Sequence, residues 1–177
     1  MLNGQRSETV KAIAQVATYE GPNGLIVHIE QDVLAHLCGN AQRKCWSREA
    51  GGQLFASIKN NRWIVAKATG PRATDFRSRF SFRPDRKAEK AEIFTLFREG
   101  LHYVGDWHTH PQDVPSPSHT DIRNTTETVQ SSEHSLPGFL MAIVGRLPAP
   151  DGLWLSFHDV RGGYAQCPLH RDRSIRG

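Results

Sequence analysis

Apolar residues recur along this chain at two different spacings, and each spacing predicts one kind of element. The clearest helical pattern lies in residues 84–100, where small or apolar side chains follow one another at intervals of three from Ala88 to Phe97. Pro84 stands where a helix begins and Gly100 where it ends, so we expect one helix between them. Weaker helical periodicity is present at residues 7–19, 31–38 and 118–135.

Alternating or continuous apolar runs predict strands at residues 25–29, 51–58, 63–68, 79–82, 102–110, 139–144 and 153–160. Residues 70–77 have the composition of a loop. Helical segments fall between the strands, which is typical of an α/β or α+β domain with one mixed sheet. The turn signal at residues 21–24 separates a helical N-terminal extension, residues 1–20, from one domain at residues 21–177. This extension is either a helix packed on the domain or a mobile arm.

Composition narrows the class of protein. The chain is 38% hydrophobic and 23% charged, which is ordinary for a globular domain. No stretch approaches the ~20 apolar residues of a membrane span, and the three cysteines form no Cys-x-x-Cys pair. The excess of 22 Lys and Arg over 18 Asp and Glu is spread along the chain, which is compatible with an acidic protein partner. We therefore expect a cytoplasmic protein that binds neither nucleic acid nor a membrane.

The most informative segment contains two histidines and an aspartate. Residues two apart on a strand point to the same face, so His108 and His110 place their imidazoles side by side. Seven residues separate His110 from Ser118, and two more separate Ser118 from Asp121. If Ser118 caps a helix, Asp121 in the first turn can point to the same place. Two imidazoles and one carboxylate leave a fourth position open, as in a catalytic zinc site. Ser-x-x-Asp is also a common helix-capping box that needs no metal.

A metal-dependent hydrolase also needs a carboxylate outside the ligand set to accept a proton from water. Glu49 is a candidate, because it stands at the start of a predicted strand beside Gly51 and Gly52, which allow close approach of backbones. From this segment alone, a solvated charge at a strand end is the simpler interpretation. Asp106 shares the strand face of the two histidines and could reach the site, whereas we expect His119 to face solvent.

Taken together, these motifs resemble those of the JAMM (MPN-plus) zinc metalloproteases. His108-x-His110-Pro, Ser118 and Asp121 match the metal-site motif, and Glu49-x-Gly-Gly matches the upstream acidic element of the prokaryotic branch. The resemblance covers roughly residues 24–160. It implies a single MPN (JAB)-like α/β domain, with a curved mixed β-sheet flanked by helices. It also points to the bacterial subgroup encoded with ubiquitin-like conjugation enzymes in antiviral operons.

The same resemblance implies a role for each candidate residue. His108, His110 and Asp121 are zinc ligands, Glu49 is the general acid/base, and Ser118 helps to hold the oxyanion. The implied activity is that of a deubiquitinase-like isopeptidase or peptidase, which hydrolyses the bond after the C-terminal glycine of a ubiquitin-like modifier or its conjugate. The implied partners are that modifier or conjugate and, beyond it, the conjugation enzymes or their target.

Two other classes of function compete with this one. A zinc hydrolase of small molecules or sulfur-carrier adducts could use the same site, but would not need a sheet edge to which a modifier's extended tail adds as a strand. Residues 70–82 are the candidate edge. Arg72, Arg77 and Arg79 beside it either hold acidic groups of the modifier or target, or form only a solvated loop. A non-catalytic binding module is less favoured, because the ligand positions and Glu49 are all present.

Overall fold

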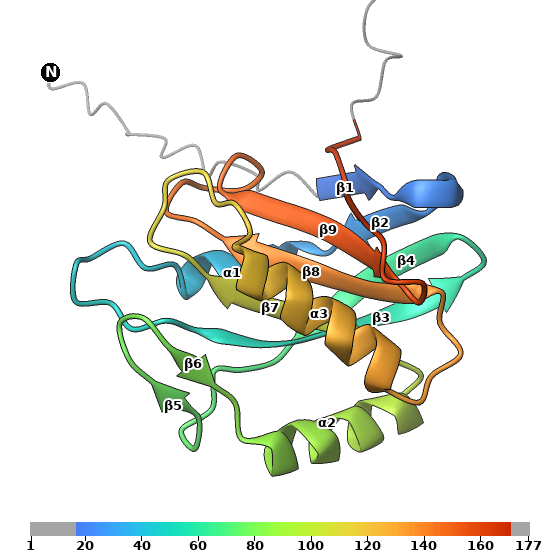
Figure 1. Cartoon of the computed structure of the whole chain (residues 1–177), viewed down its shortest axis with the longest axis horizontal. Helices are drawn as coiled ribbons and strands as arrows, with labels where there is room; N and C mark the ends of the chain where they lie inside the picture. The colour runs from blue at the N-terminus through green and yellow to red at the C-terminus, as the bar shows by residue number, and fades with distance from the viewer. Residues whose placement is uncertain (1–16, 171–177) are drawn as a thin grey trace, which may run out of the picture.

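The computed structural model describes residues 17–170, and its central feature is a curled mixed sheet of eight strands (Figure 1). The strands lie in the order β1-β2-β4-β3-β7-β8-β9-β10. The β2–β4 and β7–β8 pairs are parallel, and the other neighbours are antiparallel. The strands are β1 (Ala17–Glu20), β2 (Ile26–Ile29), β3 (Gly51–Lys59), β4 (Arg62–Ala68), β7 (His102–Thr109), β8 (Gly138–Val144), β9 (Leu153–Asp159) and β10 (Tyr164–Gln166).

Helices cover both faces of this sheet, as the predicted α/β class requires. On one face, α1 (Gln31–Gly39) adds Val33, Leu34 and Leu37 to the main apolar cluster, which also contains Trp107 of β7. On the other face, α3 (His119–Ser131) packs against β8 and β9, and α2 (Arg86–Arg98) packs against β7 and β3. Figure 1 shows α3 in front of the sheet and α1 behind it. A short 3-10 turn occupies Pro22–Gly24.

The helices predicted at residues 31–38, 84–100 and 118–135 are confirmed, with small changes at their ends. Asp85 caps α2, because its side chain accepts hydrogen bonds from the backbone N–H groups of Lys87 and Ala88. Ser118 caps α3, which ends at Ser131 and so is shorter than the pattern at residues 118–135 predicts. Within the described residues no helix is long and apolar enough to cross a membrane.

Two local predictions are wrong. Ala17–Glu20 form strand β1 and not the end of a helix, because they pair antiparallel with β2 and bury Ala17 and Tyr19 at every second position. The rest of the predicted helical extension, residues 1–16, lies outside the described residues. The predicted strand at residues 79–82 is mostly a turn, which joins β5 (Phe76–Arg77) to β6 (Phe82–Arg83). These two short strands pair only with each other in the described sheets.

Strand β7, which contains His108 and ends just before His110, lies in the middle of the sheet between β3 and β8. Its pairing with β3 shifts in register where Leu54 lies opposite Gly105. Gly105 has a φ of +141°, and a β-carbon there would collide with the carbonyl group of Leu140 on β8. Beyond this irregularity the register is regular up to Thr109, which fixes the face to which each following side chain points.

Candidate metal centre

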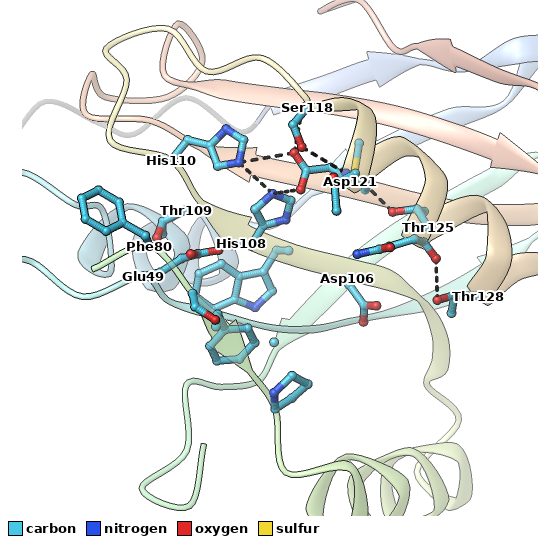
Figure 2. A pocket seen from close by; sticks show the side chains of 18 of the residues that line it. Glu49, Phe80, Asp106, His108, Thr109, His110, Ser118, Asp121, Thr125 and Thr128 are labelled. Carbon is cyan, nitrogen blue, oxygen red and sulfur yellow. Dashed lines mark hydrogen bonds and ion pairs between the residues drawn. The ribbon is translucent and has the colours of Figure 1, made fainter. Parts of the chain in front are cut away.

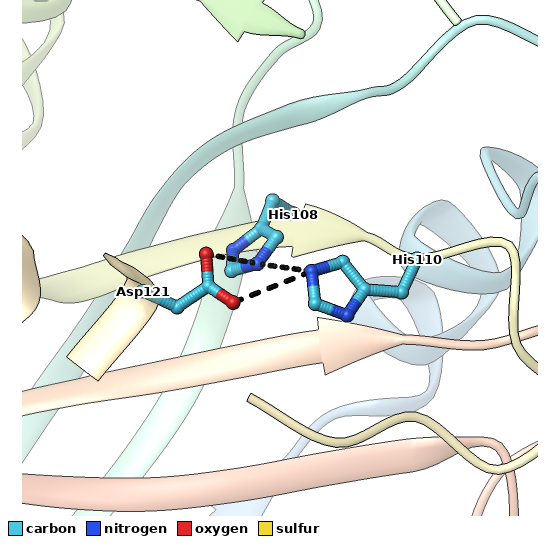
Figure 3. A group of neighbouring side chains, drawn as sticks. All are labelled: His108, His110 and Asp121. Atoms are coloured by element: carbon cyan, nitrogen blue, oxygen red, sulfur yellow. Dashed lines mark hydrogen bonds and ion pairs between the residues drawn. The ribbon is translucent and has the colours of Figure 1, made fainter. Parts of the chain in front are cut away.

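His108 and His110 lie side by side, as the strand alternation predicts. Their Nε2 atoms are 3.2 Å apart, one on β7 and the other just beyond its end (Figure 3). Trp107 and Thr109 point to the opposite face and are 1% and 0% exposed. The Nδ1 atom of His110 lies 3.0 Å from the carbonyl oxygen of Ser116. A carbonyl can only accept, so a neutral His110 carries its proton on Nδ1 and keeps the Nε2 lone pair free for a metal.

Asp121 reaches the same place from the first turn of α3. One of its oxygens is 3.4 Å from Nε2 of His108, and the other is 3.4 Å from Nε2 of His110 (Figure 3). The capping box is present as well, because the backbone N–H of Ser118 donates to Asp121 at 2.7 Å and Ser118 Oγ accepts from the N–H of Asp121 at 3.2 Å. The two interpretations of Ser-x-x-Asp are therefore compatible: the cap orients Asp121 toward the histidines.

These three side chains fit a divalent metal such as zinc. One ligand atom from each lies within 4.8 Å of the other two, and two imidazole nitrogens with one carboxylate oxygen form the donor set of an open zinc site. Partial burial raises the pKa of Asp121, but hydrogen bonds from His108 and His110 outweigh it and hold that pKa well below its ordinary value. The carboxylate is therefore ionised at neutral pH, which is the state that binds a cation.

Glu49 faces the same space without belonging to the ligand group. It lines one cavity of about 600 Å³ together with His108, His110, Ser118 and Asp121 (Figure 2). Partial burial raises the pKa of Glu49 above its ordinary value, although the two histidines work against this shift. A half-buried carboxylate with a raised pKa is suited to accept and return a proton. Glu49 is thus more than a solvated charge at a strand end.

The sheet brings Glu49 to the cavity through its antiparallel pairing. Gly51, two residues further on, lies opposite His108 in the register of β3 with β7. A β-carbon on Gly52 would collide with the carbonyl of Thr69, and one on Gly51 would press on the ring of Phe82. The expectation that these glycines allow close approach of backbones is confirmed.

Residues other than the five predicted site residues also line the cavity. Asp106 lines it, on the strand face it shares with the histidines, and burial together with the charge of Glu89 raises the pKa of Asp106 to about 7. Thr125 of α3 and Phe80 of the β5–β6 turn line it too, and no local sequence signal points to either. His119 is exposed, as expected.

Comparison with known proteins finds one with the same fold and several with related sequences. The solution structure of a protein from Desulfitobacterium hafniense has the same fold, with a TM-score of 0.57 at 17% identity over 78% of this chain and 87% of that one. A CD-NTase/cGAS isopeptidase of Escherichia coli is 28% identical over 68% of this chain and 76% of its own length. A second, from Pseudomonas aeruginosa, is 29% identical over 70% of this chain and 80% of its own.

A probable metalloprotease of Sinorhizobium fredii is 30% identical to this chain, over 67% of it and 75% of the relative. The model of a family described as prokaryotic homologs of the JAB domain matches residues 30–156. That match spans the helix α1, strands β3 and β7, the cap of α3 and all five predicted site residues. The chain therefore belongs to the family of prokaryotic JAB-domain proteins.

Proposed function

We propose that this JAB-domain enzyme, of the metalloprotease and isopeptidase class, is a zinc-dependent isopeptidase that cleaves after the C-terminal glycine of a ubiquitin-like modifier or its conjugate. One observation carries the proposal: a three-ligand site and a separate carboxylate, Glu49, line the same cavity. The names of the relatives, isopeptidase and metalloprotease, support the same class of reaction.

The residues divide the work of hydrolysis between them. His108, His110 and Asp121 would hold zinc, which when bound makes water a stronger nucleophile and polarises the scissile carbonyl. Glu49 accepts the proton of the attacking water and passes it to the departing amine, for which its raised pKa suits it. The Ser118 hydroxyl accepts a helix N–H and keeps its own proton to donate to the oxyanion.

The substrate tail has a place to bind beside this site. The β5–β6 hairpin borders the cavity through Phe80 and Phe82, and each of its strands has one edge without a partner in the described sheets. An extended peptide can add to such an edge through main-chain hydrogen bonds. The proposal expects a glycine at the end of the tail, because a side chain at the scissile residue would crowd the ligands.

The three arginines near this hairpin do not act as one group. Arg72 forms ion pairs with acidic residues of its own chain, including Asp75 and Glu92, and Arg77 donates to the carbonyl of Glu49 at 2.8 Å. Both are therefore held by contacts within their own chain and are not solvated loop residues. Arg79 is exposed, with its guanidinium 4.9 Å from the ring centre of Phe80, and of the three it is the most accessible to an acidic group of a partner.

A bacterial ubiquitin-like protein fused to a reporter, with its terminal glycine at the junction, tests the proposal. Cleavage should occur after that glycine, stop with a chelator, return with zinc, and fall when the glycine is replaced by a bulky residue. A protein that cleaves the fusion without regard to that residue is not a modifier-specific isopeptidase. Turnover of a small amide without any cleavage of the fusion would favour the small-molecule or sulfur-carrier hydrolase instead.

A further inference from the structure

Gln42, a residue with no predicted role, lies behind the cavity and joins three segments of the chain. Its side chain is buried, with 2% of the residue exposed. The amide nitrogen donates to the carbonyl of Arg79 at 3.1 Å and to that of Ser47 at 3.4 Å, and the amide oxygen accepts from the Thr109 hydroxyl at 3.0 Å. Gln42 is not among the residues that line the cavity. Its contacts therefore act on the site only through other residues.

The Thr109 hydroxyl links Gln42 to the segment that carries Glu49 through a second hydrogen bond. It accepts a hydrogen bond from the backbone N–H of Ala50 at 3.0 Å while donating to Gln42. The backbone N–H of Thr109 in turn donates to the Ala50 carbonyl at 2.9 Å. Thr109 lies between the two metal-site histidines, so the strand that carries the ligands also holds the residue next to Glu49.

The β5–β6 hairpin holds Glu49 itself, as Thr109 holds the neighbouring Ala50. The N–H of Glu49 donates to the carbonyl of Ser78 at 2.8 Å, and the carbonyl of Glu49 accepts from Arg77 Nε at 2.8 Å. All four backbone polar groups of Glu49 and Ala50 are thus occupied by Thr109 or by the hairpin, although the segment belongs to no helix or strand. Gln42 connects these two supports, since it contacts both Thr109 and Arg79.

We propose that Gln42 is a positioning residue for Glu49: through the Thr109 hydroxyl and the Arg79 carbonyl it fixes the backbone from which the carboxylate reaches the cavity. This inference rests on the proposed function of Glu49 as general acid/base. General acid/base catalysis depends on placing the carboxylate within hydrogen-bond reach of the reacting proton. A displacement of about 1 Å can lower the rate by as much as about 100-fold.

The variant Gln42→Met tests this, because it keeps the length of the side chain and removes the amide. We expect kcat on the glycine-linked fusion to fall between about 10- and 100-fold, with KM and zinc content unchanged. Thr109→Val, which removes only the hydroxyl from the same chain of hydrogen bonds, should lower kcat similarly. The double variant should lose less than the product of the two single losses, because both single variants remove the Thr109–Gln42 hydrogen bond. Ser156→Ala, which removes a buried hydroxyl 3.2 Å from Nε2 of His158, is the matched control and should leave kcat unchanged.

A second comparison asks whether Gln42 acts through Glu49. In a Glu49→Gln background, Gln42→Met should cause no further loss of the residual rate. An equal further loss there, or loss of zinc, or a rise in KM at constant kcat, would overturn the positioning role. If Gln42→Met does not fold, Thr109→Val decides alone, and a wild-type kcat in that variant refutes the proposal. Failure of the proposed function is a different result: the wild type does not cleave the fusion, or Glu49→Gln stays fully active.

Discussion

Ser118 has two tasks in the proposed enzyme, and two substitutions at this one position can separate them. Its Oγ caps α3 by accepting the N–H of Asp121, and its proton is the proposed donor to the oxyanion. Alanine at a helix N-cap costs about 1 kcal/mol of stability, whereas glycine costs only a few tenths. Both residues lack a hydroxyl. Ser118→Ala and Ser118→Gly should therefore differ in stability and agree in activity.

The expected change in Tm follows from the size of the domain, and the expected change in kcat follows from the loss of one oxyanion donor. A loss of about 1 kcal/mol lowers Tm by roughly 2–4 °C in a chain of this size, so Ser118→Ala should melt about that much lower and Ser118→Gly within about 1 °C of wild type. Loss of one oxyanion donor lowers kcat by about 100- to 1,000-fold, which we expect for both variants. Melting of metal-free protein keeps bound zinc from shifting the comparison. A glycine variant with nearly wild-type kcat would refute the donor role and leave Ser118 as a helix cap alone.

Three further predictions address the metal, the acid/base and pH. Purified protein should contain about one zinc per chain by elemental analysis, and His108→Ala combined with His110→Ala should remove it; zinc retained by that variant would place the site elsewhere. Glu49→Gln should keep zinc but lose hydrolysis by orders of magnitude, whereas loss of its zinc would make Glu49 a ligand. Burial lowers the pKa of His158 from 6.5 to about 4, so the folded state holds it neutral. Above pH 6.5 His158 is neutral in both the folded and the unfolded state, so it does not lower the free energy of unfolding. As the pH falls from 6.5 toward 4, the unfolded state takes up a proton that the folded state does not, and the free energy of unfolding decreases by about 3 kcal/mol, at about 1.4 kcal/mol per pH unit. Urea unfolding across this range should show that slope in wild type and not in His158→Gln, and equal slopes would contradict the assignment.

Local sequence was sufficient for the parts of the site that local geometry determines. The same-face placement of His108 and His110 follows from strand alternation, and Asp121 follows from the helix cap at Ser118. Glu49 is different, because its approach depends on the pairing of β3 with β7, which joins segments far apart in the sequence. Its own segment made it a candidate but favoured a solvated charge, and the family resemblance was needed to assign it the role of general acid/base.

The incorrect predictions have a similar origin. Ala17–Glu20 carry a weak helical pattern, but a tight turn returns the chain and β2 offers a partner for every backbone group on one side. In residues 79–82 the alternation of Arg, Phe and Ser resembles a strand, yet the chain turns there and Phe76 pairs with Arg83. Gln42 gave no signal at all, since a buried amide is recognisable only from the groups around it.

The shortness of the β5–β6 hairpin has a consequence for the behaviour of the protein at high concentration. An open strand edge that can accept an extended peptide can also accept the same edge of another molecule, which is how many sheet proteins aggregate. Here each strand has two residues, Phe76–Arg77 and Phe82–Arg83, and the guanidinium of Arg83 lies 4.6 Å from the ring centre of Phe76. Two such hairpins would form few hydrogen bonds and would bring like charges together. The edge proposed to bind the substrate tail is therefore a poor site for self-association.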